Sequence, residues 1–518
     1  MKLIRYIRTI RHMKMIQVVW RLVLKFNRLK LFLFPQKILY KSFHIPKLIL
    51  INNNHNSINC KLFDMTIKLD EIDWEKNRDK LINYHLHYFD FLNNCNNQIG
   101  EQAIKKWIVN NSPSVNNDGW EPYPLSLRIV NWIFFFSRHG RKPDKEIIKS
   151  LYLQGQWLFK QRELHLQANH LLKNIVSLLF WGYCFDDKKI IKWSLKNLYR
   201  QLQEQFTKSG LHYEFSSTYH AISVIDILNS YNLIQSEDVK IDKKLIIGIE
   251  NVLKNGVKWV EKLSDEYGYL PIGDVNYEGC PNADQIKLYA QKLGVIKNEM
   301  MDIEFPTFPF FKNEHFKIML VNSSFSPNYN SAHSHQDKLS ILLWYKDKPI
   351  FTDTGNYSYK FSSERLYSRD VEAHNTIQID QFHQAELWDV FRVGYRGEIE
   401  KRKIGNKEIY STFIHKKYRH QRRIKSVGRK IIIVDIIIAQ GHHSFKQFFH
   451  IHPDNSIKKT TKGLIVNDVV NIKFQNDYQL KKTEFYPKMY KKDVQNTVII
   501  SGKFKNKMEI VTEIYDIL

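Results

Sequence analysis

Apolar residues recur at intervals of three and four positions over much of residues 70–290. This is the spacing of one face of an α-helix, and short polar turns separate the stretches. Repeated helical hairpins are therefore the simplest arrangement for this part of the chain. The predicted helices cover residues 125–136, 147–159, 171–185, 190–206 and 219–234.

The pattern changes after Phe305-Pro306 to short runs of β-branched and aromatic residues. Such runs, bounded by polar turns, are typical of strands, and the second half is predicted to be antiparallel β, in the form of a sandwich. The boundary falls near 295–312, where Pro306 and Pro309 interrupt the chain. The predicted strands include residues 341–345, 350–352, 430–438, 445–451 and 497–500.

These patterns predict an α+β multidomain protein with three parts. Residues 1–70 form a basic N-terminal arm packed on the helical domain, residues 71–300 form the helical domain, and residues 301–518 form the β domain. The length of 518 residues agrees with two or three domains. With 43% hydrophobic residues and only 20 Gly and 14 Pro, the composition excludes collagen-like and low-complexity chains.

The four cysteines lie far apart and form no CxxC pair. A disulfide scaffold and a cysteine-based zinc finger are therefore both disfavoured. The chain also lacks the run of about 18–20 uncharged apolar residues that a membrane-spanning helix needs. No cleavable signal is evident, because Arg21 and Lys25 interrupt the apolar candidates. This favours the cytoplasm or an inner membrane surface, with the cell envelope as the alternative.

The first fifty residues carry 12 Lys and Arg and no acidic residue, interleaved with apolar side chains such as Trp20 and Leu22. Such an arm can pack on its own domain, or it can lie on an anionic membrane face. The whole chain has a net charge of 78 − 53 = +25, which suits nucleic acid, anionic lipid or acidic polysaccharide. Nucleic acid is disfavoured because no helix-turn-helix, RNA-recognition or zinc-finger signature is present.

Four polar clusters interrupt apolar surroundings and are candidates for chemistry. Asn169-His170 opens one predicted helix, where Asn169 alone is most simply an N-cap. Residues 214–220 precede another helix, and there Tyr219 alone could be a half-buried core residue. In His333-Ser334-His335-Gln336-Asp337, alternation places the two imidazoles and Asp337 on one side of an extended segment.

The fourth cluster combines Asp353 with Ala373-His374-Asn375. Histidine and carboxylate side chains on neighbouring strands can bind a divalent metal, and zinc is the usual partner of two His and one Asp. The alternative is a polar network in which Asp353 pairs with an imidazole. From the residues alone, both interpretations stay open.

Taken together, these clusters resemble the heparinase II/III-like polysaccharide lyases, which are relatives of alginate and oligoalginate lyases. The resemblance keeps the motif order over nearly the whole chain. It implies an incomplete (α/α) toroid followed by a C-terminal antiparallel β-sandwich, with the active cleft where they meet. The motifs that carry it are the N-terminal arm, 84–90, 119–124, Asn169-His170, 216–220, 333–337, Asp353-Thr354-Gly355 and Ala373-His374-Asn375.

The resemblance implies β-elimination at a uronic acid of an acidic polysaccharide. Asn169, with His170, would stabilise the sugar carboxyl as negative charge grows beside it. Tyr219 would act as base, acid or both, and His333 would take the complementary proton-transfer role. As a base, Tyr219 would need nearby positive charge, because a phenol with a pKa near 10 stays protonated at neutral pH.

The family's metal maps onto His335, Asp353 and His374, where we expect a structural zinc that pins the loop of His333. Aromatic and arginine side chains are the candidates for substrate binding, because flat rings can contact sugars and guanidinium groups can pair with their acidic groups. These are Trp120, Tyr123, Arg128, Arg365 and Arg369.

Two alternatives to a lyase remain. One is a catalytically inactive carbohydrate-binding or polysaccharide-assembly factor of the same fold, and the other is a zinc-dependent hydrolase. For a lyase, we expect a role in exopolysaccharide or capsule metabolism.

Overall fold

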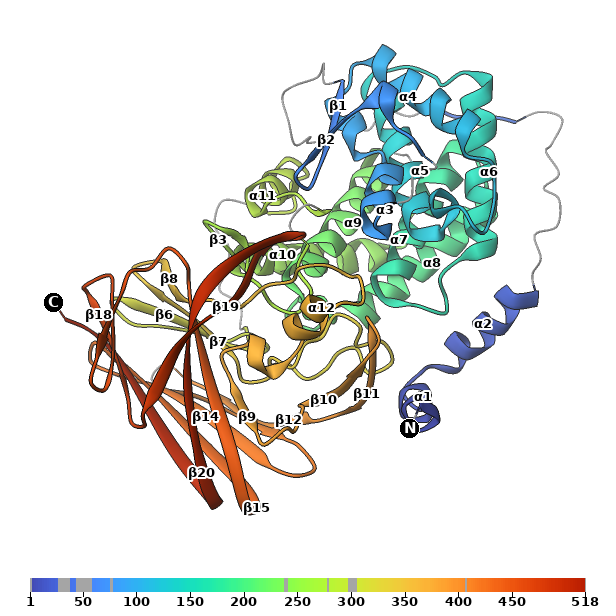
Figure 1. Cartoon of the computed structure of the whole chain (residues 1–518). Helices are drawn as coiled ribbons and strands as arrows, with labels where there is room; N and C mark the ends of the chain where they lie inside the picture. Colours follow the sequence, from blue (N-terminus) through green and yellow to red (C-terminus); the bar gives the residue numbers. More distant parts are fainter. Residues whose placement is uncertain are drawn as a thin grey trace.

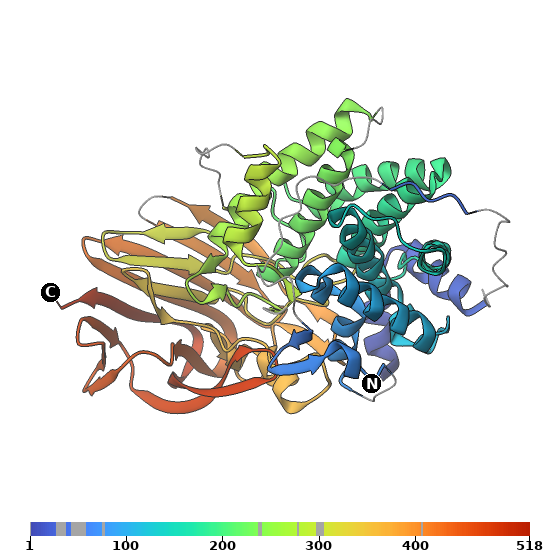
Figure 2. The same cartoon turned by 90° about the horizontal axis from the view of Figure 1, so that it is seen from above.

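The protein is described by a computed structural model. Figures 1 and 2 show a helical half and a sheet half lying side by side. The predicted boundary at 295–312 and the predicted arm both fall partly outside the described residues. The structure describes residues 2–26, 38–42, 58–74, 78–236, 241–276, 279–296, 305–405 and 408–517.

The helical half contains long helices joined by short turns, as the apolar spacing predicts. Several begin at a capping side chain; Asp144, for example, accepts a hydrogen bond from the amide of Ile147 at 2.9 Å. All five predicted helices are confirmed, with ends shifted by a few residues. The helices are α3 (Lys80–Tyr88), α4 (Asn97–Asn110), α5 (Pro122–Arg138), α6 (Lys145–Gln161), α7 (Ala168–Phe185), α8 (Lys188–Gln205), α9 (Ser217–Ser236), α10 (Lys243–Lys262) and α11 (Ala283–Lys292).

Helix α7 is the centre of this half. It packs against α5, α6, α8 and α9, and nearly all of its side chains are buried. Its sequence is apolar all round, which is typical of a helix surrounded by other helices. The exceptions are polar residues at its beginning, including Asn169, and the buried Lys173. These polar positions face the functional cavity described below.

The C-terminal half is built on a large antiparallel sheet, which confirms the predicted β domain. Its two longest strands, β15 and β20, pair along most of their length. Residues 430–438 of β15 also pair with β14, whereas residues 445–451 pair with β9 and β8. These two long strands therefore connect the layers of the domain. The strands of the sheet are β5 (Phe310–Lys312), β6 (Phe316–Leu320), β7 (Ile341–Tyr345), β8 (Lys348–Phe351), β9 (Ile377–Ile379), β12 (Glu398–Ile404), β13 (Glu408–Ile414), β14 (Arg419–Val427), β15 (Lys430–Ile451), β16 (Ile457–Thr460), β17 (Gly463–Val466), β18 (Val470–Phe474), β19 (Tyr478–Lys488) and β20 (Lys491–Asp516).

Three shorter pairs of strands lie outside this sheet. They are β1 (Asn59–Leu62) with β2 (Met65–Lys68), β3 (Ser264–Asp265) with β4 (Gly268–Tyr269), and β10 (Ala385–Trp388) with β11 (Arg392–Arg396). The short helix α12 (Ser363–Ser368) follows β8.

A separate apolar cluster joins the two halves. It contains Trp259 and Leu263 from the end of α10, and Leu342 and Trp344 from β7. Leu270 and Ile272 belong to the same cluster, and they follow β4 directly. Burying these large side chains together fixes the segment after β4 against the sheet. That segment carries a key residue of the functional site.

The N-terminal arm contributes two helices, α1 (Lys2–Ile10) and α2 (Met15–Phe26). Figure 1 shows them on one side of the molecule, next to β11. Helix α1 contacts the β10–β11 hairpin through Arg8 and Glu386, and α2 contacts the helical half through Gln17 and His165. No helix in the described part of the chain combines the length and apolar character required to cross a bilayer.

Candidate functional site

A cavity of about 1460 Å³ opens between the two halves. Its walls come from the inner faces of α3, α5, α7, α9 and α11, and one end is closed by side chains of the β half. Asn169, His170, Tyr219 and His333 all line this cavity. The structure thus brings together the four residues that the sequence proposes for catalysis, although they come from three distant segments.

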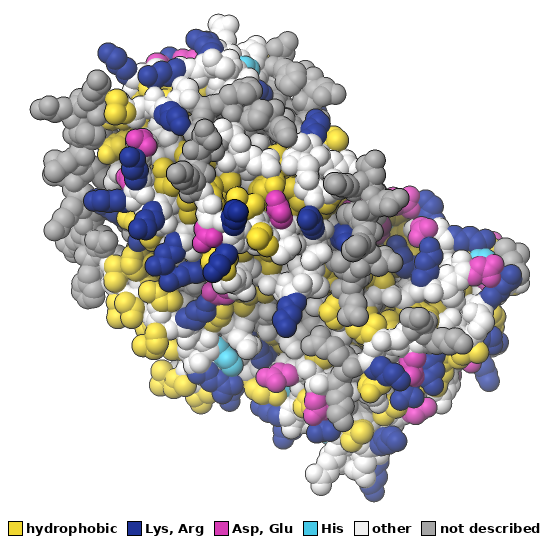
Figure 3. Space-filling model, turned by 180° about the vertical axis from the view of Figure 1, so that it is seen from behind, with side chains coloured by type: hydrophobic (Ala, Val, Ile, Leu, Met, Phe, Trp, Pro, Cys, Tyr) yellow, Lys and Arg dark blue, Asp and Glu magenta, His cyan; other side chains and the backbone are white. Residues whose placement is uncertain are grey.

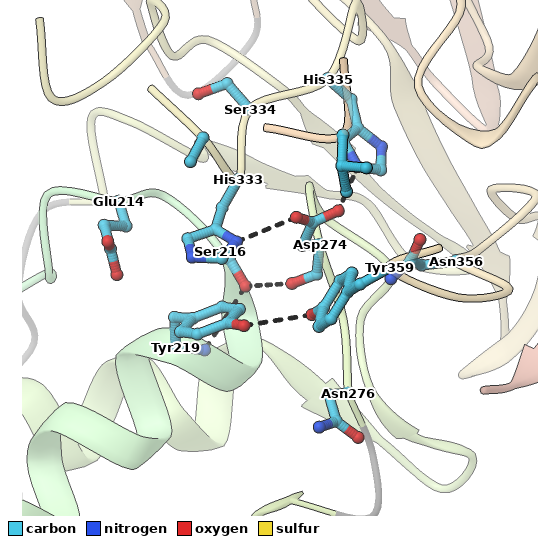
Figure 4. A network of polar contacts seen from close by, with 12 residues as sticks. Glu214, Ser216, Tyr219, Asp274, Asn276, His333, Ser334, His335, Asn356 and Tyr359 are labelled. Atoms are coloured by element: carbon cyan, nitrogen blue, oxygen red, sulfur yellow. Dashed lines mark hydrogen bonds and ion pairs between the residues drawn. The ribbon is translucent and has the colours of Figure 1, made fainter. Parts of the chain in front are cut away.

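The rings of Tyr219 and His333 stack on each other (Figure 4), with centroids 3.8 Å apart and planes 24° apart. Tyr219 belongs to the first turn of α9, and His333 lies on a loop before β7. This loop is rich in turns and is not the extended segment that the sequence predicts. His333 and His335 nevertheless reach the same carboxylate, whereas the third predicted member of that face, Asp337, pairs with Lys338.

That carboxylate is Asp274, which is completely buried. It binds Nδ1 of His333 at 2.9 Å, Nε2 of His335 at 2.8 Å, and both terminal nitrogens of Arg365. Burial alone would raise the pKa of Asp274, but Arg365 and the two imidazoles hold it well below the usual range. Because Asp274 is ionised, the bonded Nδ1 of His333 carries the proton. Nε2 is then the nitrogen of His333 that can exchange a proton with a ligand.

Two further carboxylates support the start of α7. Nδ2 of Asn169 donates to both carboxylate oxygens of Glu214, at 3.0 and 2.9 Å. Burial raises the pKa of Glu214. Nδ1 of His170 lies 2.9 Å from Glu163; burial acts to lower the pKa of His170, but Glu163 outweighs it and the pKa is raised. The site therefore favours an imidazolium at His170 beside the amide of Asn169.

A second phenol lies next to Tyr219. The hydroxyl of Tyr219 is 3.2 Å from the hydroxyl of Tyr359, which also lines the cavity. Burial and the charge of Asp274 raise the pKa of Tyr219 above its ordinary value. The groups around Tyr219 therefore do not supply the positive charge that it would need to act as a base in the free protein. Tyr219 keeps its proton at neutral pH and is poised to donate it.

Two of the predicted substrate-binding residues belong to the helical core. Trp120 packs between Trp107 and Trp157, and its Nε1 donates to the carbonyl of Asn111 at 3.0 Å. Arg128 is completely buried and stacks on the ring of Trp107, 3.8 Å from its centroid. Neither side chain lines the cavity, and substrate binding by these two residues stays a prediction.

Arg365 and Arg369 are also buried, and both act within the protein. Arg365 donates to Asp274, to Asn356 and to the carbonyl of Val390. Arg369 donates to the carbonyls of Val390, Ala332 and Ser334. Through these contacts they hold the loops around His333, and their contact with substrate stays a prediction. Of the five predicted substrate-binding residues, Tyr123 does line the cavity, and its ring lies 4.6 Å from that of His170.

The predicted zinc ligands lie close together but are engaged with other groups. Nδ1 of His374 binds Asp353 at 2.7 Å, and Nε2 of His335 binds Asp274. The remaining nitrogens, Nδ1 of His335 and Nε2 of His374, are buried and have no hydrogen-bond partner among the described residues. These two free nitrogens fit a bound cation, and Asp353 would orient His374. However, no group of three or more His, Cys, Asp or Glu side chains in the described ranges is arranged to hold a metal.

Two residues of the site, Asp274 and Tyr359, were not singled out by the sequence, whereas Glu214 was included only as part of the cluster 214–220. Asp274 follows Gly273, whose φ of +59° and close approach to the carbonyl of His333 require a glycine. A Gly-Asp pair in a loop was the one available signal, and it is weak. Tyr359 stands four residues after the Asp353-Thr354-Gly355 motif and could have been included with it.

Comparison with known proteins connects this geometry to a family. The family models "Heparinase II/III N-terminus" and "Heparinase II/III-like, C-terminal" match residues 50–264 and 308–514, respectively. No curated protein sequence matches the chain.

Solved structures share the fold at low sequence identity. A heparinase III structure is 15% identical, with a TM-score of 0.69 over 86% of this chain and 79% of that chain. The heparan sulfate lyase HepC from Pedobacter heparinus is 16% identical, with a TM-score of 0.57 over 89% and 81%. A Streptomyces coelicolor A3 chondroitin AC lyase in complex with chondroitin sulphate is 6% identical, with a TM-score of 0.53 over 84% and 74%. The predicted toroid followed by a β-sandwich is thereby confirmed.

Proposed function

We propose, since the chain belongs to the heparinase II/III-like family of polysaccharide lyases, that it cleaves a uronic-acid-containing polysaccharide by β-elimination. One observation carries the proposal. A protonated phenol, Tyr219, is stacked on an imidazole, His333, whose Nδ1 is fixed by a buried carboxylate, and both line a cavity between the two halves. This arrangement offers an acid and a base to a single bound sugar.

The main barrier to elimination is electrostatic. Removing the proton on carbon five places a second negative charge next to the sugar carboxylate, so that carboxylate must be neutralised first. His170 supports this role because Glu163 favours its charged form. Asn169 also lines the cavity, and the buried carboxyl of Glu214 holds its amide in place. Together they would stabilise the growing enolate-like charge.

Proton transfer would then follow from the two stacked rings. Nε2 of His333 accepts the proton from carbon five, and the electron pair of that bond forms the double bond between carbons four and five. The bond from carbon four to the glycosidic oxygen breaks, and Tyr219 donates its proton to that oxygen. Asp274 stabilises the imidazolium formed at His333. Tyr359, at 3.2 Å, can return a proton to Tyr219 after turnover.

We also propose a bound zinc ion with a structural role. His335 and His374 would hold the ion through their free nitrogens, and the ion would tie the His333 loop to the strand that follows His374. No proton transfer in the reaction above needs it. Elemental analysis of protein purified without added metal tests this proposal, and a stable protein that contains no metal would refute it.

Ultraviolet absorbance tests the proposed reaction, because the product carries a carbon–carbon double bond conjugated to the carboxylate. A panel of acidic polysaccharides should include at least one that gains absorbance with the protein. Replacing His333 by Ala should abolish the signal while leaving the circular dichroism spectrum unchanged. Chain shortening without absorbance would instead support the zinc-dependent hydrolase, and tight binding without cleavage would support the inactive factor.

A further inference from the structure

Helix α1 is attached to the protein by its polar face. Arg5 and Arg8 both pair with Glu386 of β10, and Thr9 accepts a hydrogen bond from Nε1 of Trp388 at 3.1 Å. An amphipathic helix of a globular protein normally buries its apolar side and exposes its polar side. In α1 this arrangement is reversed.

The apolar face of α1 points into solvent. Leu3, Ile7 and Ile10 lie within about 60° of one another around the helix axis, and they are 73%, 58% and 49% exposed. Such a row is costly in water, because each exposed side chain forgoes the free energy of burial. The orientation is set by the contacts to Glu386 and Trp388, so the face is held outward.

Helix α2 repeats the arrangement. Its inner side carries Gln17, which donates to the carbonyl of His165 at 3.2 Å, and Trp20, which donates to the carbonyl of Arg162 at 2.5 Å. Its outer side carries Met15, Val19 and Leu22, which are 76%, 45% and 53% exposed. Two consecutive helices therefore present apolar rows to solvent on the same arm. Figure 3 shows hydrophobic side chains gathered at the edge of the molecule where these helices lie, with basic side chains around them.

The charge of the arm indicates what covers this surface. Residues 2–26 contain seven Lys and Arg and no Asp or Glu. Arg11 and Lys25 are exposed. A second copy of this basic chain would bring cations against cations. A bilayer with anionic headgroups matches both properties, because it accepts apolar side chains and attracts cations.

We propose that α1 and α2 form a membrane-binding surface that places the protein on an anionic lipid bilayer. The helices lie in the plane of the interface and do not cross it, since the 12 residues of α2 span only about 18 Å and a hydrocarbon core is about 30 Å thick. This goes beyond the proposed lyase activity and does not depend on it.

The arm also touches the segments that build the catalytic site. Arg162 and His165, which α2 contacts, lie directly before Gln167 and the start of α7. The β10–β11 hairpin, which α1 contacts, carries Phe391, whose ring lies 5.9 Å from His333. Membrane binding would therefore hold the cavity at a fixed place near the lipid surface, where a membrane-associated polysaccharide is within reach.

Sedimentation of the full chain with vesicles tests this proposal. We expect binding to vesicles of phosphatidylcholine with phosphatidylserine, and weak binding to phosphatidylcholine alone. Replacing Ile7 or Leu22 by Ser should lower the partition coefficient about 10- to 100-fold, because each buries one large aliphatic side chain. Replacing Arg11 or Lys25 by Gln should lower the partition coefficient about five-fold. Added salt should lower it as well.

Ile247 of α10 supplies the matched control, since it is 55% exposed and lies outside the arm. The Ile247→Ser variant should bind vesicles like the parent, and Ile7→Ser should keep full lyase activity on a soluble substrate. The proposal is overturned if the parent binds neither vesicle, if it binds both equally, or if Ile7→Ser and Ile247→Ser behave alike. It is also overturned if the parent dimerises without lipid and Ile7→Ser abolishes the dimer, because a second copy then covers this face.

Discussion

Replacing Asp274 by Asn is the sharpest test of how the site is built. The substitution preserves shape but removes the negative charge that binds Arg365, His333 and His335. Breaking a buried ion pair on one side costs about 3–5 kcal/mol of the free energy of unfolding. The amide also no longer fixes the proton on Nδ1 of His333, and loss of such an orienting carboxylate lowers kcat by about 10,000-fold in a comparable serine protease site.

Asp435 provides a control that separates stability from catalysis. It too is a buried carboxylate that binds one arginine, Arg422, through two nitrogens and one imidazole, His420. Asp435→Asn should therefore destabilise the protein by a similar amount, measured by urea unfolding. Only Asp274→Asn should also lower kcat by about 1,000-fold or more, measured by ultraviolet absorbance on folded protein. Equal kcat values for the two variants would refute the role given to Asp274.

Lowering the pH should destabilise the protein by protonating the same carboxylate, Asp274. The folded pKa of Asp274 is depressed, so its contribution to stability is complete above the ordinary pKa of about 3.9. The contribution is lost as the pH falls through the lower folded value. The parent should consequently lose stability in acid more steeply than Asp274→Asn, which has no proton to gain at this position. Parallel curves of unfolding free energy against pH would contradict this interpretation.

Three further predictions concern the neighbouring groups. Tyr219→Phe should lower kcat about 100- to 10,000-fold through loss of the acid while substrate binding, measured by calorimetry, is kept; unchanged kcat would exclude the acid role. Glu163→Gln should move the titration of His170 to lower pH, because Glu163 raises that pKa; the alkaline fall of kcat/KM should move with it, and an unmoved NMR titration would contradict the pairing. Gly273→Ala should cost about 1–3 kcal/mol, because φ is +59° and the added methyl would lie 2.6 Å from the carbonyl oxygen of His333; urea unfolding would show no loss if this contact can relax freely.

The fold could be predicted from the sequence where local pattern and tertiary structure agree. The apolar spacing predicted a helix over 171–185, and α7 ends at the same residue and begins three residues earlier. The prediction is close because a helix packed on all sides has few polar positions. Residues 430–438 and 445–451 were predicted as two strands, whereas the structure has the single strand β15. The polar, Gly-containing segment between them is typical of a turn, but pairing with β20 keeps it extended through an irregularity near His442.

The site could be predicted only as far as its residues lie in local clusters. Asn169, Tyr219 and His333 each belong to a polar run within an apolar context, and they do converge on one cavity. Asp274 binds partners 59 and 91 positions away, and no local pattern reports such a contact. Arg128 was assigned to the cavity because helical spacing does not tell which neighbour a given face meets.

The central claim is that this protein cleaves by elimination and not by adding water. Digestion of a cleaved polysaccharide in water enriched in heavy oxygen, followed by mass spectrometry of the products, tests this claim directly. Elimination predicts a new unsaturated end that is one water lighter than a hydrolysis product, with no heavy oxygen incorporated by bond cleavage. Fragments that carry heavy oxygen at the new chain end and show no unsaturation would contradict the account.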